Sequence, residues 1–217
     1  MIGQIYTSLL CVKGGGCGAD GGIVISPFSE MEAKNMRFKL FRHLHTIGRH
    51  RRQVIRHCAK AGIFFQGLFH DVSKLSPTEF IPSVKYYQGN RSPNEREREI
   101  FGYSKAWMHH KGRNKHHFEY WVDINPLTKM YEPVPMPMRY LKEMFCDRVA
   151  ASKIYQGKNY NNIHPLQYFL RGNARKKMNQ KTADVLEEWL TILSEQGEKA
   201  AFRHIKKIKN NFDYTKE

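Results

Sequence analysis

The chain has 217 residues and carries 36 Lys and Arg against 20 Asp and Glu, a formal net charge of +16. That length suits one domain with a sizeable core, and the surplus of positive charge attracts phosphate-bearing partners: a nucleotide, a nucleic acid or an anionic surface. No apolar run approaches the roughly 20 residues that span a bilayer, and the four cysteines form no CxxC pair, so we expect no membrane segment, no zinc motif and a reducing, cytoplasmic location.

The first 35 residues differ in composition from the rest of the chain. Six glycines lie between positions 14 and 22, and ordering such a stretch costs much conformational entropy. The stretch lacks the GK[ST] ending of a phosphate-binding P-loop. We therefore predict a flexible leader over residues 1–35 and a single helical domain over residues 36–217. Met31 and Met36 are both plausible alternative starts, so part of the leader need not be native.

The first predicted helix covers residues 36–62 and ends at Gly62, a favourable C-cap. Three of its histidines lie seven residues apart on the face that carries its apolar side chains: His43, His50 and His57. We expect that face to be buried, which makes each of the three either a core or boundary histidine or a ligand. His45 shares a face with two arginines and is expected to be solvated.

Further helices are expected after this one. A second is predicted over residues 64–74. The segments SPTEF (76–80) and SPNE (92–95) both have the pattern of a capping box, with serine at the N-cap, proline at the first position and glutamate at the third. The helix that starts at the second of these segments is expected to reach residues 106–110.

The second half of the chain begins with irregular segments and ends in helices. Residues 111–121 (KGRNKHHFEYW) are predicted to form a loop, and the prolines of residues 124–137 exclude a helix there. A long helix is predicted over residues 138–157, followed by amphipathic segments near 182–195 and 198–210. No convincing alternating strand is present, so the sequence predicts an all-α fold.

The adjacent residues His70 and Asp71 interrupt the apolar run IFFQGLFHD. A buried carboxylate without a partner is costly, so Asp71 requires a cation or several hydrogen-bond donors. Imidazole nitrogen and carboxylate oxygen are common metal ligands, and neighbouring side chains on a helix can reach one divalent ion. A second carboxylate, Asp147, lies in an apolar helical context, where the alternative is a salt bridge to Arg148 or to a basic residue of another helix.

Two histidine pairs, His109–His110 and His116–His117, flank the basic segment KGRNK. They could supply a second metal position or bind phosphate oxygens. They could also lie on the surface of a nucleic-acid-binding loop, where neighbouring aromatic rings would stack on bases. The rings in question are Phe118, Tyr120 and Trp121.

An upstream helical histidine, a His–Asp doublet and a distant helical aspartate together resemble the HD-domain superfamily of metal-dependent phosphohydrolases. HDVSK is similar to the HD-x-x-K form, in which the lysine contacts the substrate phosphate. QGLFHDVSKLSPTEF, AWMHHKGRNKHHFEYW and PMPMRYLKEMFCDRVAAS are similar to an uncharacterised bacterial and phage family, a domain of unknown function, over about residues 37–170. The resemblance implies an HD-like helical bundle.

The resemblance also implies roles for particular residues. The implied metal ligands are His50, His70, Asp71, Asp147, His110 and His117. HRRQV resembles the His-x-x-x-Val opening of the superfamily, which favours His50 as the upstream ligand, with His43 as the alternative. Phosphate-binding cations are expected at Lys74, Lys111 and Arg113. Catalytic roles are expected for Asp71, Lys74 and His110, with one or two divalent ions (Mn, Fe, Zn, Mg, Co or Ni).

The function expected from this resemblance is the hydrolysis of a phosphomonoester or phosphodiester, including those of nucleotides, by metal-activated water. Two alternatives remain open. One is a basic helical module that binds nucleic acid and has a structural or degenerate metal site. The other is an HD-like di-iron oxygenase.

Overall fold

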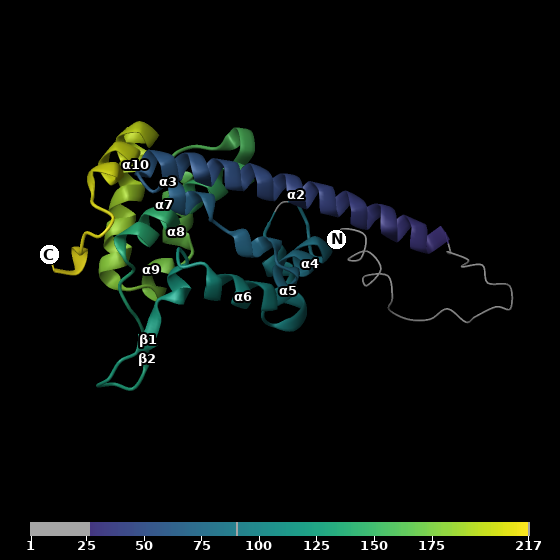
Figure 1. The fold of residues 1–217 in the computed structure, drawn as a ribbon, viewed down its shortest axis with the longest axis horizontal. Coiled ribbons are helices and arrows are strands. Elements are labelled where there is room, and N and C mark those ends of the chain that lie inside the picture. The colour runs from purple at the N-terminus through teal and green to yellow at the C-terminus, as the bar shows by residue number, and fades with distance from the viewer. Residues whose placement is uncertain (1–26, 90, 217) are drawn as a thin grey trace. The chain divides into compact units, whose positions relative to one another are not determined.

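The computed structural model describes residues 27–89 and 91–216, with side chains from residue 32 onward. Helices dominate this part of the chain (Figure 1), which confirms the predicted all-α class. Their bounds are α2 Pro27–Ala61, α3 Phe64–Leu68, α4 Pro77–Lys85, α5 Pro93–Phe101, α6 Lys105–Arg113, α7 Met138–Gln156, α8 His164–Arg171, α9 Ala174–Lys177 and α10 Gln180–Lys207. None of the described helices is long and apolar enough to cross a membrane.

The chain divides into two units between Asn35 and Met36. The first helix begins at Pro27, nine residues before the predicted start at Met36. Residues 27–35 of the predicted leader are therefore helical, and its residues 1–26, including the glycine-rich stretch, lie outside the described residues. The hydrophobic core lies in the second unit.

The core of the second unit is built around α7, whose middle is buried on almost every side. Phe145 of α7 lies fully inside, with its ring edge-on to Trp189 and Phe202 of α10 at centroid distances of 6.0 and 5.6 Å. The helix ends at Gly157, as predicted, where φ is 55°. α10 bends at Gly197, so it contains the two C-terminal segments that the sequence indicated.

The structure differs from the sequence-based expectations in three places away from the candidate site. α5 ends at Phe101 because Gly102 adopts a left-handed conformation, so α6 is a separate helix. α8 and α9 were not predicted. A short antiparallel hairpin pairs β1 (Val122–Ile124), which ends where the segment expected to be irregular begins, with β2 (Tyr131–Pro133) inside that segment (Figure 1). Three-residue strands are too short to show an alternating pattern in the sequence.

His57 occupies the core where α2 meets α7 and α10. Its Nδ1 donates to the carbonyl of Cys146 at 3.2 Å, and its Nε2 accepts from Gln53 at 2.9 Å. The ring packs against Phe202 at 5.1 Å. Burial is the main reason that the pKa of His57 falls from 6.5 to about 4. His57 is therefore a core histidine, neutral at physiological pH.

The free energy of unfolding of the metal-free protein is expected to fall as the pH drops from 7 to 5. Between pH 6.5 and 4 the unfolded chain binds a proton at His57 that the folded chain does not, and this costs about 2 kcal/mol at pH 5 relative to pH 7. Urea denaturation at both pH values measures the loss. A His57→Gln variant is expected to lose about 2 kcal/mol less over that interval; equal losses would contradict this explanation.

Candidate metal centre

The His70–Asp71 doublet lies in a turn and not in the predicted helix. α3 stops at Leu68, and a 3₁₀ turn, η1 (Val72–Leu75), begins after Asp71. Asp71 adopts a left-handed conformation, with φ 55° and ψ 25°. Aspartate tolerates this region better than most residues, but such a conformation persists only where surrounding contacts hold it. The turn leaves both side chains buried, with His70 at 1% and Asp71 at 7% exposure.

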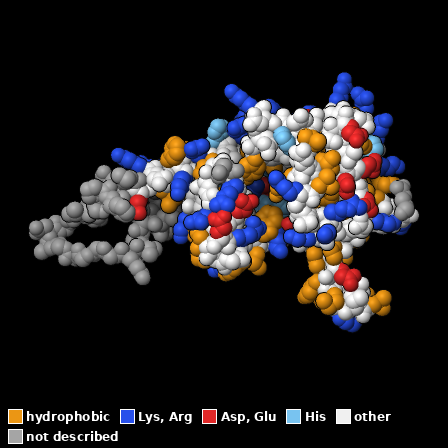
Figure 2. Space-filling model, turned by 180° about the vertical axis from the view of Figure 1, so that it is seen from behind, with side chains coloured by type: hydrophobic (Ala, Val, Ile, Leu, Met, Phe, Trp, Pro, Cys, Tyr) orange, Lys and Arg blue, Asp and Glu red, His pale blue; other side chains and the backbone are white. Residues whose placement is uncertain are grey.

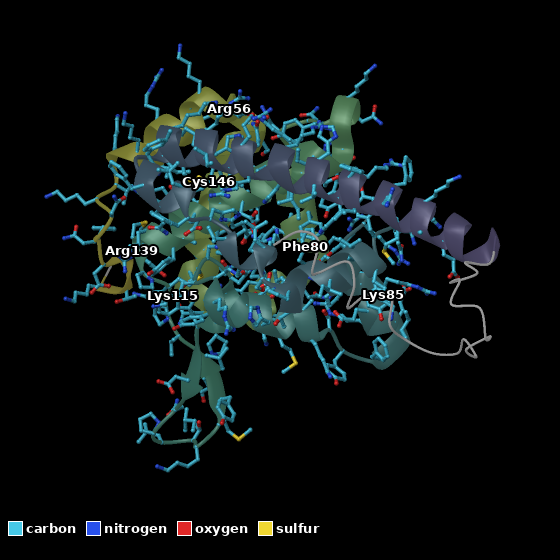
Figure 3. The ribbon with its side chains drawn as sticks, turned by 45° about the vertical axis from the view of Figure 1, so that its right-hand side comes forward. Arg56, Phe80, Lys85, Lys115, Arg139 and Cys146 are labelled. Carbon is cyan, nitrogen blue, oxygen red and sulfur yellow. The ribbon has the colours of Figure 1, made fainter. Side chains whose placement is uncertain are left out.

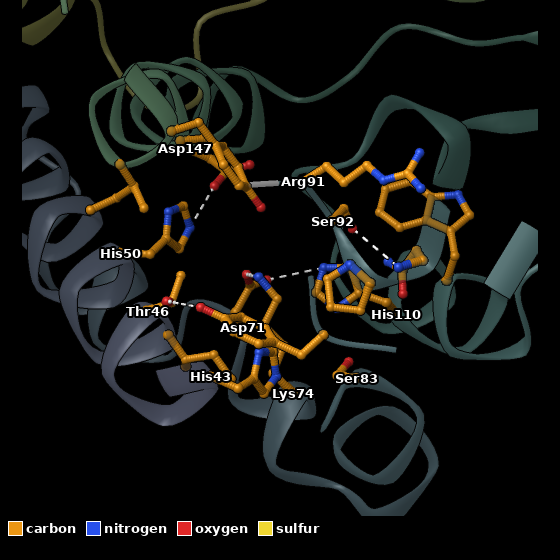
Figure 4. Close-up of a pocket in the computed structure, with 18 of the residues that line it drawn as sticks. His43, Thr46, His50, Asp71, Lys74, Ser83, Arg91, Ser92, His110 and Asp147 are labelled. Atoms are coloured by element: carbon orange, nitrogen blue, oxygen red, sulfur yellow. Dashed lines mark hydrogen bonds and ion pairs between the residues drawn. The ribbon is translucent and has the colours of Figure 1, made fainter. Parts of the chain in front are cut away.

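The first group of candidate ligands combines this turn with α2 and α7. His50 Nε2 lies 2.9 Å from Asp147 Oδ1, and His70 Nε2 lies 3.5 Å from the same oxygen. Asp71 Oδ2 is 3.2 Å from His70 Nε2. Figure 4 shows His50 and Asp147 facing each other, with Asp71 nearby. Residues separated by almost 100 positions thus offer their ligand atoms to one point.

The second group lies on the other side of Asp71. Its Oδ1 is 3.3 Å from His110 Nε2 and 3.5 Å from His116 Nε2. His117 completes this group. The two oxygens of Asp71 therefore face different sets of ligands, an arrangement that suits a carboxylate shared by two ions. His116 was not among the predicted ligands, because the sequence offers no basis for choosing between two adjacent histidines.

Several buried atoms of both groups lack a hydrogen-bond partner. They are His50 Nε2, His70 Nε2, Asp71 Oδ1, His116 Nε2 and His117 Nε2. Buried polar atoms are rarely left unsatisfied, and here half of those found in the described chain meet at one place. Imidazole nitrogens with carboxylate oxygens form a donor set that binds Mn, Fe, Co, Ni or Zn ions. The residues therefore fit one or two divalent cations.

Burial also holds some of these histidines neutral, the state that a metal ligand requires. It lowers the pKa of His117, and the neighbouring His116 and His110 lower it further. Burial likewise lowers the pKa of His50, against the opposing effect of the neighbouring Asp147 carboxylate.

Two glutamates that were not among the predicted site residues orient the histidines. Glu143 Oε1 accepts from His70 Nδ1 at 2.9 Å and lies 3.2 Å from His116 Nδ1. Burial raises the pKa of Glu143, but its hydrogen bonds to these two rings bring it down to about 2. With Nδ1 bound in this way, the Nε2 lone pair of each ring is directed at the ion position, as in carboxylate–histidine–metal triads.

Glu79 orients His110, a histidine of the second group, in the same way. Its two oxygens accept from His110 Nδ1 at 2.7 Å and from His109 Nδ1 at 2.6 Å. The predicted capping box of α4 does not form, since Ser76 caps the helix without a side-chain hydrogen bond.

The sequence held a signal that could have identified Glu143 as a site residue. Glu143 precedes Asp147 by four residues and therefore lies on the same face of the helix.

Replacing Glu143 by glutamine is expected to weaken metal binding by about 10- to 100-fold, because the ring orientation of two ligands depends on its carboxylate. Titration with a competing chelator measures the dissociation constant. Glu195→Gln, which changes an exposed carboxylate on α10, is the matched control and is expected to bind like the parent. Unchanged affinity in Glu143→Gln would exclude the orienting role.

A cavity of about 180 Å³ opens beside the two groups. Lys74 lines it, with Nζ 2.6 Å from Asp71 Oδ2. Burial lowers the pKa of Lys74, but the nearby carboxylates of Asp71 and Asp147 raise it above its ordinary value, so the lysine stays protonated. Arg91 lines the same cavity (Figure 4) and was not predicted.

Three other predicted site residues do not belong to either ligand group. Lys111 and Arg113, which were expected to bind phosphate, do not line this cavity. His43 lines it but belongs to neither ligand group, and its ring lies edge-on to Tyr87 at 5.4 Å. Burial and Lys74 lower the pKa of His43 to about 4.

The aromatic residues of the 111–121 segment are only partly available for stacking on bases. Phe118 and Trp121 pack against the core, and the indole of Trp121 donates to the carbonyl of Lys115 at 2.7 Å. Tyr120 is exposed, whereas His116 is buried. Two of the three rings that were predicted to stack on bases, Phe118 and Trp121, are therefore largely engaged in packing against the core.

The chain was compared with known proteins. A family model described as "Family of unknown function (DUF5662)" matches residues 39–192, a range that includes both ligand groups. No curated protein and no solved structure matches the chain. The resemblance to the HD-domain superfamily stays a prediction.

Proposed function

The chain belongs to DUF5662, a family of unknown function, and for its metal centre we propose the divalent-metal-dependent hydrolysis of a phosphomonoester or phosphodiester. The observation that carries this proposal is the convergence of unpartnered Nε2 and Oδ1 atoms on the two sides of Asp71. A protonated lysine beside the same carboxylate adds a site for a phosphoryl oxygen.

Each of the two ligand groups would hold one ion. His50, His70 and Asp147 would hold one ion together with Asp71 Oδ2. Asp71 Oδ1 and three histidines would hold the other: His110, His116 and His117. A divalent cation polarises a phosphoryl oxygen and lowers the pKa of water from about 15.7 to about 7, which supplies the nucleophile for hydrolysis at neutral pH.

Two cationic side chains of the cavity would bind the negatively charged phosphoryl group of the substrate. The ammonium group of Lys74 has three N–H donors, of which Asp71 takes one, so two remain for phosphoryl oxygens. Arg91 stands in the cavity lining, where its guanidinium is also paired with Glu99 at 2.5 Å. Charge that develops on the phosphoryl oxygens therefore meets a fixed positive group, the arrangement that stabilises such transition states.

The test is to load the full chain separately with Mn, Fe, Co, Ni or Zn and to measure bound metal and turnover together. The expected result is one to two ions per chain by mass spectrometry, with hydrolysis of p-nitrophenyl phosphate or its bis ester by at least one loaded form. Stoichiometric metal without hydrolysis of any phosphoester would reject the proposal and favour a structural metal in a binding module. An iron form with a diferric absorption band but no hydrolysis would favour an oxygenase.

A further inference from the structure

Six exposed cationic side chains lie on the outer surfaces of α2 and α10, and together they are called the basic face here. They are Arg49, Arg52, Arg56, Lys199, Arg203 and Lys206. Figure 3 shows Arg56 beside the yellow helix α10, and Figure 2 shows Lys and Arg side chains along the upper right edge of the molecule.

The two helices that carry the basic face are packed against each other at this end of the second unit. The rings of His57 and Phe202 lie 5.1 Å apart, and Lys60 pairs with Glu198 at 3.3 Å. A Cβ atom placed on Gly62 would lie 3.6 Å from Cγ of Lys206. The cations from the two helices therefore belong to one continuous surface.

None of the six cations forms an ion pair or a side-chain hydrogen bond with another described residue, in contrast to Lys60. Arg52 and Arg56 stand four residues apart on one helix, where like charges destabilise the helix by about 0.2–0.5 kcal/mol. Glu198, the acidic residue of α10 that faces α2, is already paired with Lys60 and Lys153. The basic face thus concentrates uncompensated charge that is free to bind a polyanion.

The kind of polyanion follows from the neighbouring apolar side chains. Phe64 and Phe65 begin α3 directly after the α2 turn, are 44% and 77% exposed, and stand edge-on at 5.6 Å. Cations that track phosphates, together with exposed rings that stack on bases, are the two components of single-stranded nucleic-acid sites. A membrane surface would need apolar side chains beside the six cations, but Val54, Cys58 and Ala61 of α2 and the apolar face of α10 are buried in the core.

We infer that the basic face binds single-stranded nucleic acid, with Phe64 and Phe65 stacking on its bases. None of the six cations lines the cavity beside the metal centre, so this is a second site. It goes beyond the proposed hydrolase activity and does not depend on it.

The inference is tested by fluorescence anisotropy of the full chain with a labelled 20-nucleotide single strand at several salt concentrations. A variant with Arg52→Gln, Arg56→Gln and Arg203→Gln is expected to bind about 100-fold more weakly near 0.1 M salt, with the slope of log K against log salt smaller by about 2. The matched control carries Lys158→Gln, Arg171→Gln and Lys176→Gln, which remove the same charge from exposed positions outside the basic face. The control is expected to bind nearly as tightly as the parent.

Two further variants separate the alternatives. Phe65→Ser is expected to weaken binding of the single strand by about tenfold, because a stacked base is lost. Asp71→Asn is expected to bind the strand like the parent, because the metal centre is a different site. Equal losses in the two triple variants, loss of binding in Asp71→Asn, tighter binding of duplex than of single strand, or binding of phosphatidylserine vesicles without binding of the strand would each overturn the inference.

Discussion

Replacing Asp71 by asparagine is expected to remove both metal ions and to reduce phosphoester hydrolysis below detection. The two oxygens of Asp71 face the two ligand groups at 3.2 to 3.5 Å, so one substitution affects both ion positions. Asparagine has nearly the same shape and also tolerates a left-handed backbone, so the turn is expected to keep its conformation. Mass spectrometry of the metal-loaded protein counts the ions, an assay with p-nitrophenyl phosphate measures hydrolysis, and a thermal melt checks that the variant is folded.

Asp147→Asn is the comparison that distinguishes the loss of one ion from the loss of both. Asp147 contacts only His50 and His70 of the first group, so its replacement is expected to remove one ion and leave the other. A folded Asp71→Asn protein that still binds an ion with parental affinity would show that Asp71 is not shared. The same loss of metal in both variants would show that the centre holds a single ion.

Replacing Lys74 by alanine is expected to lower kcat/KM by about 10²- to 10³-fold while the bound metal stays unchanged. The ammonium lies beside the ion ligands but offers no lone pair, so it can stabilise charge on a phosphoryl oxygen without holding an ion. Removing this charge also leaves Asp71 more available to a cation, so metal affinity is not expected to fall.

Steady-state kinetics with a phosphoester that the parent turns over measures the loss, beside metal analysis of the same sample. Lys111→Ala is the matched control, because Lys111 does not line the cavity, and it is expected to keep parental kinetics. A Lys74→Ala protein that loses its metal would assign the lysine a structural role. A loss in Lys111→Ala as large as that in Lys74→Ala would contradict the positions of the two lysines.

The helical class and some helix ends were predictable because they depend on local chemistry. Gly157 ends α7 through its left-handed backbone, and Ser92 caps α5 by accepting from the amide of Asn94 at 3.3 Å. The turn at the doublet was not predictable. Gly67 packs so closely on Cys58 that a Cβ atom there would lie 2.5 Å from Cys58 Cβ, a contact that exists only once α3 lies on α2.

The sequence by itself determined that the protein is helical and basic and that His70, Asp71 and Asp147 are unusual residues for an apolar setting. Only the tertiary structure decided which histidines join them, because α2, α6 and α7 meet across long separations in the chain. The same holds for Glu79, whose spacing suits a helix cap but whose carboxylate instead binds two histidines. A hydrogen-bonding side chain takes the strongest partner within reach, and folding sets what lies within reach.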